Sequence, residues 1–187
     1  MPNKLLRILG KLEESELINM VLYPLLEIIH PGRLEFTHST NEAGRDIISY
    51  GKSIIDRDDI LCVQVKANNV SYGSQFQTKV VAPAELAKKE GVTLQNGTQI
   101  FPNEVWFITS TPFPSSKRIL VADTLKELER KNIKFIPGEE LCQLIIEKMP
   151  NLATQLLEYN NNNIISIISE FSKHSDGIAF NLDPQKK

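Results

Sequence analysis

Two polar residues interrupt an apolar run that otherwise has the composition of a buried strand. Residues 60–67 read Ile-Leu-Cys-Val-Gln-Val-Lys-Ala, so the amide of Gln64 and the ammonium of Lys66 stand two positions apart. Residues two apart on a strand share a face, so we expect Gln64, Lys66 and Cys62 to project together. The alternate apolar residues, which are Leu61, Val63 and Val65, would pack on the other face. Polar groups inside a core strand cost free energy unless something binds or uses them, which marks this strand as a candidate working site.

A carboxylate precedes this strand in the chain. The segment Glu42-Ala-Gly-Arg-Asp46 is a glycine-containing turn, and its last residue opens a second strand-like run. If the two strands pair, Asp46, Gln64 and Lys66 meet at one edge of the sheet. Carboxylate, amide and backbone carbonyl oxygens are ligands for Mg²⁺ and Mn²⁺, so Asp46, Gln64 and the Val65 carbonyl could hold a cation. Lys66 could orient a water or stabilise charge on a phosphate, and together these groups suit metal-dependent phosphodiester hydrolysis.

The second carboxylate of such a site has two candidates. Glu42 belongs to the acidic turn, and Glu16 opens a helix that could pack beside the strands. A simpler interpretation also exists for each central residue. Asp46 could be a turn carboxylate held by backbone amides, and Lys66 could be a strand-end lysine that reaches water.

Contacts with a polyanion would have to come from a local patch, because the net charge of the chain is −2 and gives no general basic field. The candidates for contact with DNA are Lys52, Asn68, Asn69, Lys117 and Arg118. The last two fall near the start of a predicted helix, where free N–H groups can meet a phosphate. The alternative for each lysine is an ordinary solvated surface residue.

The order of predicted elements indicates a mixed α/β fold. Apolar residues repeat at helical spacing over residues 4–29, with a kink expected at Pro24. Strands are predicted over residues 34–38, 46–50, 60–67, 105–109 and 133–136. Helices are predicted over residues 76–89 (broken by Pro83), from 115 or 116 to 132, and over 139–148, 152–159 and 164–171, with a loop or short hairpin over 91–103. Three early strands followed by alternating strands and helices predict a mixed sheet with helices on both faces.

Length and composition restrict the class of protein further. A chain of 187 residues is expected to form one domain or one domain with an appendage. Cys62 and Cys142 fall in apolar runs and are interpreted as buried free thiols. No apolar run approaches the roughly 18 residues that a membrane span requires, so we expect a cytoplasmic protein without membrane contact.

The acidic turn ending in Asp46, followed by Val63-Gln64-Val65-Lys66, resembles the Mrr-type branch of the PD-(D/E)xK restriction-endonuclease-like superfamily. The resemblance implies a restriction-endonuclease-like sheet core and covers about residues 12–149. We expect a nuclease domain over residues 1–150, with a helical appendage and tail over residues 151–187. The resemblance also implies Mg²⁺- or Mn²⁺-dependent cleavage of DNA, as an effector of prokaryotic defence. In that arrangement Asp46 is the metal ligand, Gln64 takes the position of a glutamate or glutamine, and Lys66 is the catalytic lysine.

Two alternatives follow from the same residues. Glutamine in place of glutamate removes one negative charge and should weaken cation binding, so Gln64 could instead mark a catalytically inactive module that binds nucleic acid. The helices over residues 152–171 could form an oligomer interface. Because the chain has no separate recognition domain, target recognition would come from self-association or from a partner protein.

Overall fold

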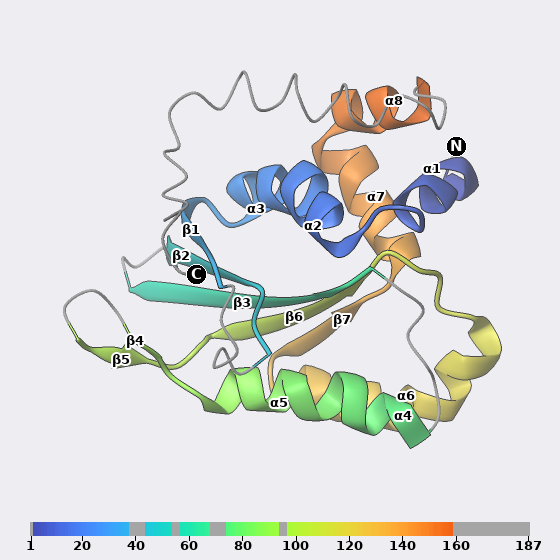
Figure 1. Ribbon diagram of the computed structural model, residues 1–187. Helices are drawn as coiled ribbons and strands as arrows, with labels where there is room; N and C mark the ends of the chain where they lie inside the picture. The colour runs from blue at the N-terminus through green and yellow to red at the C-terminus, as the bar shows by residue number, and fades with distance from the viewer. Residues whose placement is uncertain (1, 38–43, 54–56, 68–73, 94–96, 159–187) are drawn as a thin grey trace, which may run out of the picture.

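The computed structural model describes residues 2–37, 44–53, 57–67, 74–93 and 97–158, and its centre is a five-stranded mixed β-sheet (Figure 1). The sheet has the order β1 (Gly32–Phe36), β2 (Ile47–Lys52), β3 (Asp58–Lys66), β6 (Glu104–Thr109) and β7 (Ile133–Ile136). β1, β2 and β3 form an antiparallel meander, and β6 and β7 run parallel to β3. A separate hairpin consists of β4 (Val92–Thr93) and β5 (Gln99–Ile100).

One face of the sheet is covered by the helices of the N-terminal and C-terminal described segments, which lie above the sheet in Figure 1. These are α1 (Pro2–Leu9), α2 (Glu14–Leu17), the π-helix η1 (Ile18–Leu22), α3 (Tyr23–Ile29), α7 (Gly138–Lys148) and α8 (Pro150–Glu158). Their apolar residues pack with Leu61, Val63 and Val65 of β3 in one continuous core cluster.

The opposite face is covered by the helices of the central part of the chain, below the sheet in Figure 1. These are α4 (Ser74–Phe76), the π-helix η2 (Gln77–Val81), α5 (Ala82–Lys89) and α6 (Ser115–Arg130). Here Ile60 and Cys62 of β3 pack in a second cluster that contains the Phe107 ring, which stacks on Phe135 at 5.7 Å between centroids. The alternation of β3 side chains between two buried faces, expected from the sequence, is therefore confirmed.

Each of the two predicted helix breaks is present as a π-turn placed directly before a proline-containing helix. Pro24 stands at the start of α3 after η1, and Pro83 stands at the start of α5 after η2. Proline lacks the N–H and its ring clashes with the carbonyl four residues earlier. A widened turn accommodates this without ending the helix, so the helical direction continues through both sites.

The predicted helices and strands are present wherever the structure describes them, with boundaries shifted by a few residues. β1 begins at Gly32 rather than Leu34, because Gly32 pairs with Gly51 of β2. A Cβ atom at Gly32 would lie 2.0 Å from the Tyr50 carbonyl oxygen, so this close pairing requires glycine. The predicted helix over residues 164–171 lies outside the described residues. Every described helix is too short or too polar to cross a lipid bilayer.

Candidate functional site

The start of β2 and the end of β3 lie side by side because the two strands are antiparallel. The Asp46 carboxylate accepts a hydrogen bond of 2.6 Å from the backbone N–H of Val65, and the Asp46 N–H donates to the Val63 carbonyl at 2.8 Å. The structure therefore brings Asp46 beside the strand segment that carries Gln64 and Lys66. The simpler interpretation of Asp46, a turn carboxylate held by backbone amides, also applies in part, because the Val65 amide holds this carboxylate.

Gln64 is the most unusual polar residue of the site. Its side chain is 5% exposed, and its Oε1 atom is buried without a hydrogen-bond partner among the described residues. The amide packs against Gly44, which has a φ of +75° and whose added Cβ would lie 3.2 Å from Gln64 Nε2. Glycine is thus needed at 44 for both its backbone conformation and this approach. A buried acceptor without a donor costs roughly 1–3 kcal/mol, and an amide oxygen in that state is a suitable ligand for a hard cation.

Lys66 extends from the same strand end to a glutamate of α2. Its Nζ lies 3.3 Å from Glu14 Oε2, with the two side chains 44% and 41% exposed. Glu16, the residue singled out in the sequence, instead accepts the Glu13 backbone N–H at 2.9 Å and closes the first turn of α2. The spacing of Glu13 and Glu16 is that of a capping box, and this signal could have directed attention to Glu14.

Arg45 is buried rather than displayed on the acidic turn. It is 7% exposed, its Nη2 lies 4.0 Å from Glu90 Oε2, and its carbonyl accepts the Thr37 hydroxyl at 2.6 Å. Its guanidinium also faces Cys62, where burial raises the thiol pKa to about 11 against the opposing effect of the arginine charge. Arg45 thereby fixes the turn to the sheet from the α5 side, a role that the sequence analysis did not anticipate.

A cluster of buried hydroxyl groups closes the same end of the sheet. Ser110 donates to the Ala67 carbonyl at 2.6 Å, and the Thr109 and Thr111 hydroxyls lie 2.9 Å apart. Three consecutive hydroxyl residues, Thr109 to Thr111, at the end of β6 are the sequence signal for this cluster. Ser110 thereby joins the ends of β3 and β6, whereas Thr109 and Thr111 contact each other at the end of β6.

The predicted DNA contacts separate into two places. Lys52 forms an ion pair with Asp58 at 2.8 Å, at the opposite end of the β2–β3 ladder from Asp46, so the structure does not bring it to the site. Lys117 and Arg118 are exposed in the first turn of α6, which follows β6 after a short loop and contains no acidic residue in that turn. Glu42, Asn68 and Asn69 lie outside the described residues.

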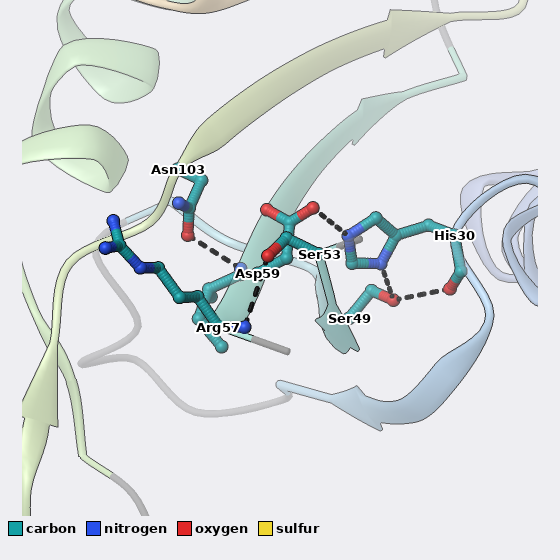
Figure 2. A network of polar contacts seen from close by, with 7 residues as sticks. His30, Ser49, Ser53, Arg57, Asp59 and Asn103 are labelled. Carbon is teal, nitrogen blue, oxygen red and sulfur yellow. Dashed lines mark hydrogen bonds and ion pairs between the residues drawn. The ribbon is translucent and has the colours of Figure 1, made fainter. Parts of the chain in front are cut away.

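A second polar cluster occupies the other half of β2 (Figure 2). His30 Nδ1 lies 2.7 Å from Ser49 Oγ, and His30 Nε2 lies 3.5 Å from Asp59 Oδ2. The imidazole lies against Gly51, where an added Cβ would meet it at 2.7 Å. These residue types could form a nucleophilic triad, but Ser49 is fully buried and its hydroxyl donates to the His30 carbonyl. The cluster therefore fastens the end of α3 to the β2–β3 hairpin.

The oxygen donors around the end of β3 are of the kinds that hard divalent cations prefer. Asp46 and Glu14 carry carboxylates and Gln64 carries a buried amide oxygen. Among the described residues, no group of three histidine, cysteine or acidic side chains could hold a metal ion by itself. A mixed carboxylate and amide set suits Mg²⁺ or Mn²⁺, whereas zinc is usually held by histidine and cysteine.

Comparisons with known proteins add one structural similarity. No family model and no curated protein matches the sequence. A solved structure of the MspJI restriction endonuclease in complex with a 27-mer oligonucleotide aligns with 83% of this chain at 15% identity and a TM-score of 0.38. The alignment covers 35% of the MspJI chain, so this chain spans about a third of its length. The chemistry proposed below therefore rests on the geometry of the site.

Proposed function

We propose that this chain is a metal-dependent endonuclease that hydrolyses phosphodiester bonds in DNA, with Mg²⁺ or Mn²⁺ as its cofactor. The observation that carries the proposal is the buried Oε1 of Gln64, which has no hydrogen-bond partner in the part of the chain that the structure describes. Gln64 lies on β3 directly before Val65, whose amide holds Asp46, and two residues before Lys66 with its exposed ammonium. An acceptor, a carboxylate and a cation at one strand end are the groups that this hydrolysis needs.

The cation would be held by Asp46, Gln64 and the backbone carbonyl of Val65. We place Glu14, rather than Glu16, as the carboxylate from the helix side, because Glu14 lies beside Lys66 and Glu16 caps α2. Glu42 remains a proposed additional ligand from the acidic turn. When bound, the cation supplies Lewis-acid polarisation of the phosphate and acidification of a water.

The protein groups around the cation would orient its carboxylate ligand and the attacking water, and would neutralise negative charge on the phosphate. The Val65 amide fixes the direction of the Asp46 carboxylate. Lys66 is a compact cation at the sheet edge that would orient the attacking water and balance the negative charge that grows on the phosphate. Glu14 holds the lysine ammonium in position at 3.3 Å.

The DNA backbone would be met by the first turn of α6. Lys117 and Arg118 place two positive charges there, where they oppose the helix dipole and would be favoured by a nearby phosphate. Such contacts position a duplex without reading its sequence. We propose that target choice comes from self-association or a partner protein, and that the biological setting is prokaryotic defence, as the motif resemblance implies.

The test is cleavage of plasmid and linear DNA with Mg²⁺, with Mn²⁺ and with a chelator. We expect cleavage that requires the metal and is abolished by Asp46→Ala and by Lys66→Ala. Lys52→Ala serves as the matched lysine control, because Lys52 lies at the other end of the ladder. Cleavage that survives both site substitutions would refute the site. Metal-independent DNA binding without cleavage would establish the inactive module instead.

A further inference from the structure

The sheet ends on one side at β1, and its outer edge has no strand partner among the described residues. The backbone N–H of Thr37 donates to the Asp46 carbonyl at 3.2 Å, one position beyond the last paired residues, which are Phe36 and Ile47. Hydrogen bonding alternates along an antiparallel ladder. Gly32, Leu34 and Phe36 therefore direct their N–H and C=O groups away from β2, toward the outer edge of the sheet.

The sequence of β1, Gly-Arg-Leu-Glu-Phe, is complementary to itself in one antiparallel register. When a second copy is centred on Leu34, Arg33 of each chain lies opposite Glu35 of the other, and Gly32 lies opposite Phe36. Leu34 then forms the central hydrogen-bonded pair with Leu34 of the second copy. The charged residues form the intervening pairs, where opposed side chains come closest.

Side chains on both faces of β1 would meet those of the second copy in this pairing. Arg33 and Glu35 are 49% and 48% exposed and already form an ion pair at 3.1 Å within one chain. On the other face, Leu34 and Phe36 are only partly buried against the core. Phe36 stacks on Tyr23 at 5.2 Å, and in the paired register its ring would lie beside Gly32 of the second copy. An aromatic residue opposite an edge glycine is a favourable cross-strand combination.

Charges on an edge strand commonly prevent pairing, but here their order selects a register. A shift of two residues in either direction would place Arg33 opposite Arg33, or Glu35 opposite Glu35, of the second copy. Like charges directly opposite each other are destabilising. A shift of one residue would exchange the faces of every side chain.

We propose that β1 pairs antiparallel with β1 of a second copy of this chain, which joins two five-stranded sheets into one across a two-fold axis. The inference is independent of the endonuclease activity. Because β1 and β3 run in the same direction within each copy, the two candidate sites would lie at opposite ends of the joined sheet. The five intervening strand spacings would separate the two β3 strands by about 24 Å across the sheet.

The first test is charge reversal in the full chain, followed by sedimentation over a range of concentrations. The wild-type chain is expected to approach twice its mass of 21.1 kDa. Arg33→Glu and Glu35→Arg should each weaken dimerisation by at least about tenfold, since each replaces attraction with repulsion. The double variant Arg33→Glu/Glu35→Arg should restore it. Thermal unfolding of each variant by circular dichroism confirms that the chain is folded.

The second test is a symmetric disulfide at Leu34→Cys. Leu34 lies on the two-fold axis, where opposed Cα atoms are about 5.5 Å apart and within disulfide reach. The native Cys62 and Cys142 are buried and should not compete. We expect a covalent dimer on oxidation, lost when Arg33→Glu is added and regained with the double reversal.

Three results would overturn the proposal. The chain could remain monomeric up to about 1 mM, a concentration that excludes even weak specific association. It could form a dimer that neither charge reversal affects, which would place the interface elsewhere. A monomer whose Leu34 amide is protected from hydrogen exchange would show that other residues of the same chain cover the edge.

Discussion

The carboxylate of Glu14 lies 3.3 Å from the ammonium of Lys66, although 52 positions separate these residues in the chain. The pair joins the short helix α2 to the end of the central strand β3. Both side chains are more than 40% exposed, and an exposed ion pair contributes only about 0–1 kcal/mol to stability. Its importance is therefore positional, since it places a carboxylate and a lysine at the strand end that also carries Gln64.

Glu14→Gln should reduce metal-dependent cleavage by roughly 10- to 100-fold, the range found when a group around a metal site is changed. The free energy of unfolding should change by less than about 1 kcal/mol, because the pair is exposed. Cleavage rates over a metal titration, together with urea unfolding, measure the two effects separately.

Glu16→Gln is the matched control for this prediction. It lies two residues away on the same helix turn and caps the Glu13 amide, so only helix stability should change, by about 0.5–2 kcal/mol at most. If Glu16→Gln lowered cleavage while Glu14→Gln did not, the assignment of the helix carboxylate would be reversed.

Gln64→Glu and Gln64→Leu should have opposite effects on the metal-free protein. Gln64→Leu removes an unpartnered buried acceptor and should leave stability unchanged or raise it. Gln64→Glu buries an additional charge and should lower stability by at least about 1 kcal/mol in chelator. Addition of Mn²⁺ should recover stability in Gln64→Glu more than in the wild type, since a ligand that binds the folded state stabilises it.

Thermal unfolding with and without Mn²⁺ measures these changes without reference to cleavage. If Gln64→Leu and the wild type showed the same metal-induced rise in melting temperature, Gln64 could not be part of the metal shell.

His30→Ala should destabilise the fold by about 1–3 kcal/mol, because it leaves the buried side of Ser49 without the imidazole that contacts it. Asp59→Asn should have a smaller effect, below about 1 kcal/mol, because Asp59 is 37% exposed. Urea unfolding of both variants gives the comparison. Cleavage at low temperature should stay unchanged in both variants, since this cluster lies away from Asp46. If a folded variant lost cleavage activity, the cluster would contribute to the site.

The buried thiol of Cys62 predicts a loss of stability at alkaline pH. Burial raises the pKa of Cys62 to about 11 from the usual value near 9, so the folded state retains the proton more strongly than the unfolded chain. The corresponding stability is full below about pH 9 and is lost as the pH rises toward 11. The total effect is at most about 2–3 kcal/mol, at 1.36 kcal/mol per pKa unit.

Cys62→Ala should therefore show a flatter fall of unfolding free energy between about pH 9 and pH 11. The cavity left by the substitution adds a constant offset, so the slope against pH is the informative quantity. Cys142→Ala is the companion variant, since burial raises the pKa of Cys142 to about 12. Identical slopes in the wild type and Cys62→Ala would contradict the burial argument for Cys62.

The fold could be predicted because the residue pattern of β3 indicates both a strand and what covers it. Its alternating residues are apolar on both sides, which indicates a strand covered by helices on each face, and the two core clusters confirm this. The meeting of Asp46 with the Gln64–Lys66 segment followed from antiparallel pairing alone. Local patterns of this kind determine which residues share a strand end.

Other features of the site could not be predicted, because they depend on tertiary packing that the spacing of residues in the sequence does not indicate. Glu14 and Glu16 are equally plausible in sequence, and only the packing of α2 against β3 decides which one meets Lys66. Arg45 directly follows the left-handed turn at Gly44 and is buried, which the charge of an arginine in a polar turn does not suggest. The charge of Lys52 predicts a DNA contact, but the length of β2 places Lys52 at the end of the β2–β3 ladder that is far from Asp46.

The π-turn at Ile18–Leu22 determines which way Glu14 faces. α2, η1 and α3 form one unbroken helical path, and Leu25 and Leu26 anchor its far end in the core. Each residue of an α-helix advances the side-chain direction by about 100°. The extra residue taken up by the wide turn thus rotates α2 by about that angle relative to α3. Pro24 follows the wide turn and favours it, because its ring cannot fit a regular α-helical turn. A proline in another part of the helical path thus sets the direction from which Glu14 approaches Lys66.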